Sequence, residues 1–520
     1  MMLKKIAVAA LSATSLLPCY AEKSKTQKRP NILFIMADDH TSQAWGIYGG
    51  VLKDYVQNKH IGRLAQEGVV LNNCFCTNSI CVPSRASILT GQYSHGSQNG
   101  VYMLRDAVKT ESNNVAKLLQ SNGYQTAIVG KWHLKTKPTG FDYFKVLPGQ
   151  GRYHNPMLKS EDCWVDGYKG GKEHKGFSTD VITDLTIDWL KHRDEDKPFM
   201  MMCHFKATHE PFDYPERYKD LYKDEEIPEP ESLYDFDKKN TGRTFEGQQL
   251  ENLGWRWEKA SANPEKWWCK YPGMPFSTAE MDSISARKKI YQKFVKDFMR
   301  CGAAIDDNIG RLLNYLDKAG LSENTVVIYT ADQGYFLGEH GFFDKRMILE
   351  ESLRMPFVIR YPKEIKGGKR NDDIILNVDF PALFADYAGI EVPKHFHGNS
   401  FRANLAGNTP KNWRKEMYYR YWEHAPIRPG HFGIRSERYK LAFFYGQPMD
   451  KDSKQKCTQP SWEFYDLHED PNEMHNAYND EKYARIIKEM KKHLFLLRKK
   501  LGDNDNSRPW IKDVIKKNCS

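Results

Sequence analysis

The stretch Asn31-Ile32-Leu33-Phe34-Ile35-Met36, which runs into Ala37-Asp38-Asp39, decides the fold class of this chain. Its apolar residues are continuous, and such a run predicts a strand buried on both faces of a parallel sheet. Ligands of open α/β sheets bind at the carboxyl ends of strands. Because adjacent carboxylates repel one another unless a cation lies between them, Asp38 and Asp39 are candidate metal ligands rather than a solubilising turn.

A second strand of this kind is predicted far downstream. The run Thr325-Val326-Val327-Ile328-Tyr329-Thr330-Ala331 leads into Asp332-Gln333-Gly334. Carboxylate and amide oxygens at two strand ends would make an all-oxygen site, which suits Ca²⁺ or Mg²⁺ better than a soft metal. We predict that Asp38, Asp39, Asp332 and Gln333 bind Ca²⁺, with Mg²⁺ as the alternative.

Helical and strand patterns alternate around these two strands. This alternation predicts an α/β fold with a large mixed, mostly parallel sheet sandwiched by helices. The further predicted elements are helices at residues 114–121, 180–190, 287–316 and 378–388, and strands at residues 124–129, 198–205 and 355–360.

A chain of 520 residues is too long for one hydrophobic core, so two domains are expected. We predict a main domain over residues 22–400 and a smaller α+β subdomain over residues 401–520, built from an antiparallel sheet and one basic helix at residues 483–501. Within the main domain, residues 213–278 are rich in proline, acidic clusters and aromatic side chains. This segment is predicted to be an insertion beside the cleft.

The segment Cys81-Val82-Pro83-Ser84-Arg85-Ala86-Ser87-Ile88-Leu89-Thr90-Gly91 predicts the start of a helix, because proline is tolerated in a first helical turn. Cys81 would then lie at the positive end of the helix, where anions are stabilised and the pKa of a thiol is lowered. Arg85 would add a fixed positive charge one turn away. From the residues alone, a buried structural cysteine is the alternative.

Three further segments carry candidate polar side chains. Gly130-Lys131-Trp132-His133 follows a predicted strand, and strand alternation would point Lys131 and His133 the same way. His209 follows another strand and is succeeded by Glu210-Pro211. Lys345 lies close in sequence to Asp332, beyond a segment with turn-forming glycines.

Together these motifs resemble those of the sulfatase family. The signature C-x-P-S-R followed by L-T-G is matched by residues 81–91, the segment G-K-W-H by residues 130–133, and a histidine in an H-x-P context by His209. The resemblance implies that a maturation enzyme oxidises Cys81 to formylglycine (3-oxoalanine), whose hydrate is the nucleophile and also binds the metal. It also implies metal binding by the three aspartates and Gln333, where many relatives have Asn or His.

The resemblance implies a role for each remaining candidate. Lys131 and Lys345 would bind the oxygens of a sulfate ester. His209 would protonate the departing alcohol, with help from Lys345, and His133 would take a proton from the second hydroxyl of the hydrate so that sulfate leaves. Arg85 would hold the hydrate and add positive potential.

The substrate implied is a sulfated carbohydrate. Residues 418–440 resemble the substrate-facing segment of glycosaminoglycan sulfatases, so His424, His431 and Arg435 are candidate sugar contacts. The tryptophans of the insertion either stack on sugar rings or anchor a long loop. Two alternatives stay open: a phosphate or phosphonate ester hydrolase of the same alkaline phosphatase superfamily, and a glycan-binding protein in which Cys81 is never modified.

Residues 1–21 predict a secretory signal, with two lysines, an apolar run too short to span a bilayer and the cleavage site Cys19-Tyr20-Ala21. We therefore expect a bacterial protein of the periplasm or the extracellular or cell-surface space. Removing the signal lowers the net charge from +10 to +8, which suits an anionic substrate. No nucleic-acid motif and no further membrane-length apolar stretch is present in the sequence.

Overall fold

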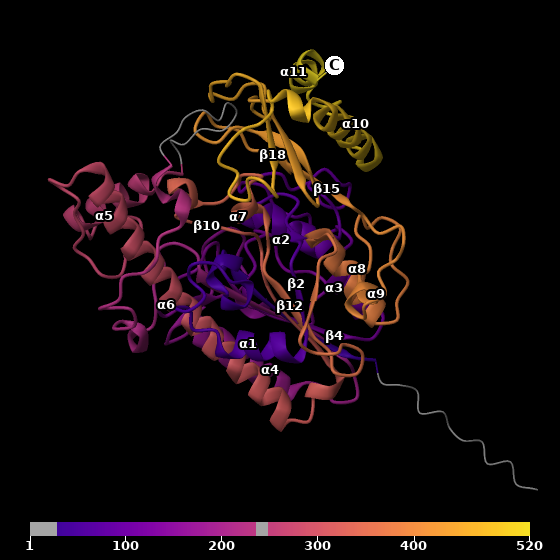
Figure 1. Cartoon of the computed structure of the whole chain (residues 1–520). Coiled ribbons are helices and arrows are strands. Elements are labelled where there is room, and N and C mark those ends of the chain that lie inside the picture. Colours follow the sequence, from indigo (N-terminus) through magenta and orange to yellow (C-terminus); the bar gives the residue numbers. More distant parts are fainter. Residues whose placement is uncertain (1–28, 236–247, 520) are drawn as a thin grey trace, which may run out of the picture.

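The computed structural model describes residues 29–235 and 248–519. Figure 1 shows a large sheet with helices on both faces and a smaller sheet near the C-terminus. The predicted signal segment, residues 1–21, lies outside the described residues. Within the described part, no helix is both long and apolar enough to cross a membrane.

Eight strands form the central sheet: β1 (Asn31–Asp38), β2 (Val69–Leu71), β4 (Gln125–Lys131), β5 (Tyr143–Leu147), β8 (Phe199–Thr208), β9 (Thr325–Ala331), β12 (Phe357–Arg360) and β13 (Lys369–Asn371). Their order is β13-β2-β12-β9-β1-β8-β4-β5. Neighbouring strands are parallel except at β12, which runs antiparallel to β2 and β9. The predicted mixed, mostly parallel sheet is therefore confirmed.

Side chains of β1 enter two separate cores in alternation, which is why the sequence of this strand is apolar without a break. Leu33 and Ile35 pack into one core, and Ile32 and Phe34 pack into the other. Helices α1 (Lys59–Glu67), α4 (Ser178–His192) and α6 (Ser283–Lys318) cover the first face. Helices α2 (Cys81–Thr90), α3 (Val115–Ser121), α8 (Phe380–Tyr387) and α9 (Arg402–Leu405) cover the second.

Short elements complete the main domain. The two-residue strands pair as β3 with β14, β6 with β7, and β10 with β11. The antiparallel pairing of β10 and β11 fixes the course of the chain directly before Lys345. The bounds are β3 (Cys74–Phe75), β6 (Met157–Leu158), β7 (Lys172–Glu173), β10 (Phe336–Leu337), β11 (Phe343–Asp344), β14 (Ile375–Leu376) and α7 (Glu350–Leu353).

The register of the central strands brings the predicted site residues to one edge of the sheet. Ala37 of β1 lies opposite Ala331 of β9, so the aspartates that follow the two strands emerge side by side. On the other side of β1, Asp38 lies opposite Thr208 at the end of β8. β8 in turn pairs with β4, which ends at Lys131. Parallel strands thus deliver their carboxyl ends to a common place, as the sequence predicts.

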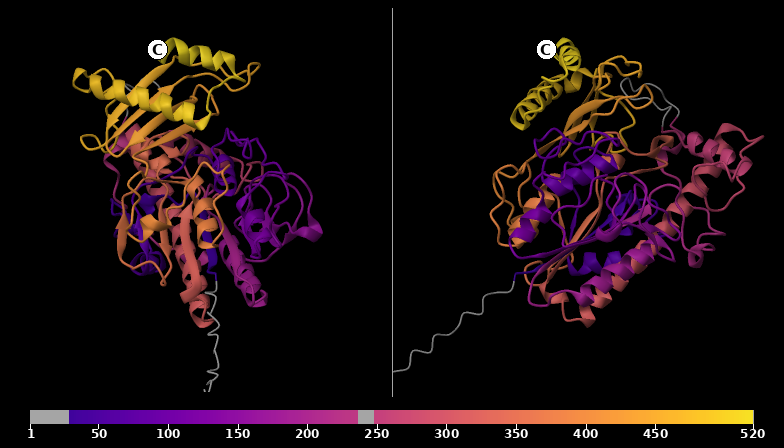
Figure 2. Two further views of the ribbon diagram at one scale, coloured as in Figure 1. Left: turned by 90° about the vertical axis from the view of Figure 1, so that its right-hand side faces the viewer. Right: turned by 180° about the vertical axis from the view of Figure 1, so that it is seen from behind.

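A second sheet is formed by four antiparallel strands, β15 (Glu416–Tyr421), β16 (His431–Ser436), β17 (Tyr439–Phe444) and β18 (Ser461–Asp466). Two helices pack beside it, α10 (Ala484–Leu501) and α11 (Pro509–Cys519), as Figure 2 shows. The antiparallel sheet is confirmed, but the prediction of a single helix is wrong. α11 nevertheless has an apolar face: Ile511 and Ile515, one helical turn apart, are buried, and Trp510 and Val514 pack against the same core. The domain boundary near residue 400 stays a prediction.

A buried ion cluster ties the segment after α10 to this sheet. Arg420 of β15 is bonded to Asp503 over 2.6 Å and to Asp505 over 2.8 Å. Arg498 bonds Asp505 over 2.7 Å. Burial opposes ionisation of Asp503, but Arg420 and Arg498 outweigh it and hold the pKa of that carboxyl below its usual range.

The variant Arg420→Met is expected to lower the free energy of unfolding by about 3–5 kcal/mol, because it leaves two buried carboxylates with one remaining cationic partner. The measurement is the apparent melting temperature at neutral pH, which should fall clearly. Arg105→Met is the matched control, since its ion pair with Asp450 is exposed on both sides and contributes little. Equal melting temperatures for the two variants would show that the cluster does not stabilise the fold.

The predicted insertion, residues 213–278, contains a helix that its sequence pattern does not suggest, α5 (Leu250–Ala262). Part of the insertion, residues 236–247, lies outside the described residues. Trp257 is buried and packs into the first core, whereas Trp255 and Trp268 are 54% and 63% exposed. One tryptophan therefore anchors the segment, while the stacking of the exposed two on sugar rings stays a prediction.

Candidate active site

Three buried carboxylates gather at the carboxyl edge of the sheet. Asp38 and Asp39 at the end of β1 and Asp332 after β9 offer oxygen atoms that lie within 4.8 Å of one another. The backbone N–H of Asp39 donates to Asp332 Oδ1 over 3.2 Å and so ties the two strand ends together. Burial raises the pKa of Asp39 to about 6, an effect that Lys345 opposes and Asp332 reinforces.

The donor set of this cluster fits a divalent cation. Asp38 Oδ1 and Gln333 Oε1 are buried, and neither forms a hydrogen bond within the described part of the chain. The amide nitrogen of Gln333 donates to Asp39 Oδ1 over 2.5 Å, which leaves its carbonyl oxygen available as a ligand. Ca²⁺ and Mg²⁺ prefer such oxygen ligands. The structure thus brings the four predicted oxygen ligands together, and the identity of the ion stays a prediction.

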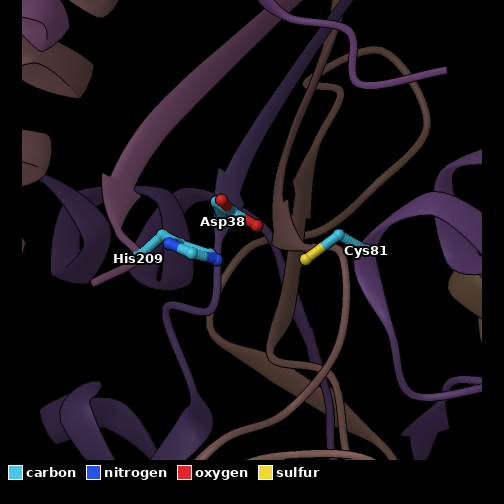
Figure 3. A group of neighbouring side chains, drawn as sticks. All are labelled: Asp38, Cys81 and His209. Carbon is cyan, nitrogen blue, oxygen red and sulfur yellow. The ribbon is translucent and has the colours of Figure 1, made fainter. Parts of the chain in front are cut away.

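Cys81 is the first residue of α2, as the sequence predicts, and its thiol faces the acidic cluster. Its Sγ atom, a carboxylate oxygen of Asp38 and a ring nitrogen of His209 lie within 4.8 Å of one another. Figure 3 shows these three side chains converging from separate segments. Gln333 Nε2 lies 3.8 Å from the same sulfur, so Cys81 also borders the proposed metal ligands.

The expected lowering of the thiol pKa of Cys81 is wrong for the unmodified residue. The side chain is 1% exposed, and burial raises its pKa to about 12. Lys345 and Arg85 oppose this shift, while the nearby carboxylates add to it. Burial beside acidic groups therefore outweighs the positive end of the helix. The thiol itself is a poor candidate for a nucleophile at neutral pH, since the thiolate is the reactive form.

Each aspartate at the end of β1 has a buried lysine as its partner. The ammonium of Lys131 contacts the carboxylate of Asp38. Lys345 Nζ lies 2.5 Å and 2.6 Å from the two carboxylate oxygens of Asp39. Burial lowers the pKa of Lys131 well below its usual range, whereas Asp332 and the direct contact with Asp38 favour its charged form. Burial also opposes the charge of Lys345, but Asp39 and other acidic neighbours outweigh it and raise that pKa.

Arg85 lies behind Cys81, one turn along α2. Its Nε donates to Asp332 Oδ2 over 2.9 Å, and its Nη1 donates to the backbone carbonyl of Lys131 over 2.8 Å. Its remaining Nη2 is 3.7 Å from Asp38 Oδ1. The guanidinium therefore connects α2 to the ends of three strands and holds the acidic cluster in shape.

Two histidines border the cations. His209 Nε2 lies 4.0 Å from Asp39 Oδ2, and its Nδ1 is 2.9 Å from the carbonyl oxygen of Glu210. His133 is buried with a φ of 59°, and its Nδ1 forms no hydrogen bond with the described residues. Burial, and next the charge of Lys131, lower the pKa of both rings well below the usual range. The negative charge of a bound sulfate would offset the charge of the nearby lysine and so raise the pKa of both histidines.

The three predicted sugar contacts lie in the second sheet or beside it. Arg435 is bonded to Glu350 over 3.1 Å and 3.2 Å and lies over the ring of Phe75. His431 and His424 are buried, and each donates to a backbone carbonyl over 2.9 Å. No hydrogen bond or ion pair joins any of the three to the acidic cluster in the residues that the structure describes. Their role as sugar contacts stays a prediction.

Gln150 also belongs to the site, although none of the sequence motifs described above includes it. Its side-chain oxygen lies 2.5 Å from Lys131 Nζ, on a turn whose flanking glycines have φ values of 58° and 70°. The signal is a polar residue between two glycines, three residues after the end of β5. Asp38 and Lys131 are identified in the same way, as polar residues at the carboxyl ends of strands.

Comparisons with known proteins agree with this geometry. Residues 30–390 match the family model described as Sulfatase, and residues 338–500 match that of the C-terminal part of N-sulphoglucosamine sulphohydrolase. An arylsulfatase of Clostridium perfringens is 28% identical over 90% of this chain and 94% of its own.

Two matches extend over nearly the whole chain. One is an N-acetylglucosamine-6-O-sulfatase of Bacteroides thetaiotaomicron, 39% identical over 95% of this chain and 91% of its own. The other is a solved structure in complex with its substrate D-glucosamine-2-N,6-O-disulfate, with a TM-score of 0.80 and 37% identity over 92% of this chain and all of that one. The chain belongs to the sulfatase family of sulfuric ester hydrolases.

Proposed function

We propose that this sulfatase removes the 6-O-sulfate from a terminal glucosamine-type sugar of a sulfated glycosaminoglycan, and releases inorganic sulfate. The observation that carries the proposal is the similarity, over 95% of the chain, to an N-acetylglucosamine-6-O-sulfatase. The structure determined with a 6-O-sulfated glucosamine supports the same substrate class.

Each residue of the site has a separate role in the proposed hydrolysis of the sulfate ester. The ammonium groups of Lys131 and Lys345 bind the sulfate oxygens and stabilise charge that develops in the transition state. His209, in its imidazolium form, gives the proton on Nε2 to the departing sugar oxygen, which leaves as the hydroxyl group. His133 would take a proton from the second hydroxyl of the hydrated residue 81, so that sulfate can leave. Arg85 keeps the surrounding groups in place.

Two further components complete the proposed chemistry. A Ca²⁺ ion held by Asp38, Asp39, Asp332, Gln333 and the modified residue 81 would supply Lewis-acid stabilisation of negative charge. Oxidation of Cys81 to formylglycine by a maturation enzyme would supply a hydrated aldehyde as the nucleophile. The support for this second component is the match of Cys81, Pro83, Ser84 and Arg85 to the C-x-P-S-R signature, within the region that matches the family model.

We further propose that the mature enzyme acts outside the cytoplasm, in the periplasm or at the cell surface of a bacterium. The support is the signal-like pattern of residues 1–21 and the positive net charge of the chain. Sulfated glycans are polyanions, and a positive protein concentrates them at its surface.

The test is sulfate release from N-acetylglucosamine carrying sulfate at O6 or at O3, by protein produced in a host that matures sulfatases. The proposal expects release from the 6-sulfate alone. Peptide mass spectrometry around residue 81 of the same sample should show formylglycine. Release from the 3-sulfate only, or full activity with an unmodified thiol, would contradict it.

A phosphonate monoester hydrolase shares the fold with a TM-score of 0.67 at 19% identity, so ester specificity needs a direct comparison. Rates on 4-nitrophenyl sulfate and 4-nitrophenyl phosphate provide it. We expect the sulfate ester to react faster. A faster phosphate ester would favour the alternative hydrolase.

A further inference from the structure

The loop that carries His209 is held by side chains from distant parts of the chain. The hydroxyl of Tyr153 donates to the backbone carbonyl of His209 over 2.6 Å. The thiol of Cys301, on α6, donates to the carbonyl of Asp213 over 2.9 Å. Both ends of this short loop are therefore fixed to the body of the main domain.

The middle of the loop is held from the insertion. One carboxylate oxygen of Glu210 accepts a bond from Arg256 Nη1 over 2.6 Å, and the other accepts a bond from the Tyr271 hydroxyl. Arg256 belongs to α5, and its guanidinium lies 5.2 Å from the ring centroid of Phe343, two residues before Lys345. We call Glu210, Arg256 and Tyr271 the Glu210 clamp.

The backbone of Glu210 also sets the orientation of the His209 ring. The Glu210 carbonyl can only accept, so His209 Nδ1 donates the hydrogen in the 2.9 Å bond between them. This leaves Nε2 facing the acidic cluster, 4.0 Å from Asp39 Oδ2, and the ring can donate a proton from Nε2 when it is in the imidazolium form, which a bound sulfate favours. Any movement of Glu210 would therefore turn the ring nitrogen away from the place where the ester is cleaved.

We propose that the Glu210 clamp is the device by which the insertion positions His209 for proton donation to the leaving alcohol. The proposal rests on the proposed function only in assigning that proton donation to His209. The side chain of Glu210 is 11% exposed and that of Tyr271 is buried, so loss of either partner leaves a nearly buried carboxylate short of hydrogen bonds. Because an underpaired buried carboxylate is costly, we expect Glu210 to move toward water and to shift the backbone carbonyl that holds the His209 ring.

The test compares Arg256→Met and Tyr271→Phe with Lys259→Met, a matched control on the exposed side of α5. Three substrates separate proton donation from binding: N-acetylglucosamine-6-sulfate, phenyl sulfate and 4-nitrophenyl sulfate. The nitrophenolate departs readily without a proton, whereas phenolate and the sugar alkoxide depend on one.

For both clamp variants we expect kcat/KM to fall by about 10²-fold on the sugar sulfate, less on phenyl sulfate and by no more than about 3-fold on 4-nitrophenyl sulfate. His209→Ala should give the same pattern with larger losses, and Arg256→Lys should restore part of the activity. Lys259→Met should match the wild type on all three substrates.

Equal losses on all three substrates would overturn the proposal, because they indicate general damage to the site. A loss confined to Arg256→Met, with a raised KM for the sugar alone, would also overturn it, since the buried Tyr271 cannot contact a sugar. Inactivity of the wild type on the sugar 6-sulfate would refute the proposed substrate. The clamp would then be judged by the phenyl and nitrophenyl esters, on which the same contrast is expected.

Discussion

Replacing Cys81 by alanine is expected to abolish turnover, with kcat/KM lower by about 10⁵-fold or more, because the residue that becomes the nucleophile is removed. The substitution shortens the side chain by one atom at the start of α2, where all ten residues are buried. The fold should survive, since Asp332 remains bonded to Arg85 on the same helix. Initial rates on a sulfate ester, with the melting temperature alongside, provide the measurement.

Cys457→Ala is the matched control, because this cysteine is exposed and its thiol donates to Gln447 and not to a residue of the acidic cluster. It should retain the full rate. Residual activity of Cys81→Ala above about one hundredth of the wild-type rate would exclude residue 81 as the nucleophile, because removing a nucleophile costs far more than this.

The variant Asp332→Asn is expected to abolish stabilisation by Ca²⁺ and to lower kcat by about 10³-fold, the equivalent of about 4 kcal/mol of transition-state stabilisation. The change preserves shape but removes one charge from the acidic cluster and turns an amide toward Arg85. In the wild-type protein, Ca²⁺ added after treatment with a chelator should raise the melting temperature, since a ligand that binds only the folded state stabilises it.

Calorimetric titration with CaCl₂ measures the same loss directly, without reference to activity. Asp184→Asn on α4 is the control, because its carboxylate is exposed and pairs with Arg311 at the surface. An Asp332→Asn protein that still binds Ca²⁺ with wild-type affinity would show that the cation, if bound, lies elsewhere.

Local sequence pattern was sufficient to predict the centre of this fold and most of the site. An apolar run that ends in charged residues identifies both a central strand and the end at which the candidate site lies, as for Asp38 and Asp332. If such strands are parallel neighbours, their carboxyl ends must lie at the same edge of the sheet, so the sequence also predicts that these residues are close together. Lys131 follows from the same rule.

Features that depend on contacts between distant segments could not be predicted in this way. Arg256 lies 46 residues from Glu210 and in a segment without visible periodicity, so nothing local pairs the two. The raised pKa of Cys81 depends on how deeply the whole of α2 is buried, which a helix-start pattern does not reveal. The ion pair of Arg435 with Glu350 joins residues 85 positions apart, so the residue type of Arg435 alone does not predict it, and the role of Arg435 as a sugar contact stays a prediction.

The pairing of three buried carboxylates with Lys131, Lys345 and Arg85 makes the site close to electrically neutral before any cation enters. A bound divalent cation would then leave the pocket with two excess positive charges. Inorganic sulfate carries two negative charges, so the two would balance. The neutral sugar product gains nothing from that excess, whereas the dianion is attracted by it. The alcohol is therefore expected to depart first, and accumulated sulfate should act as a competitive inhibitor of the next catalytic cycle.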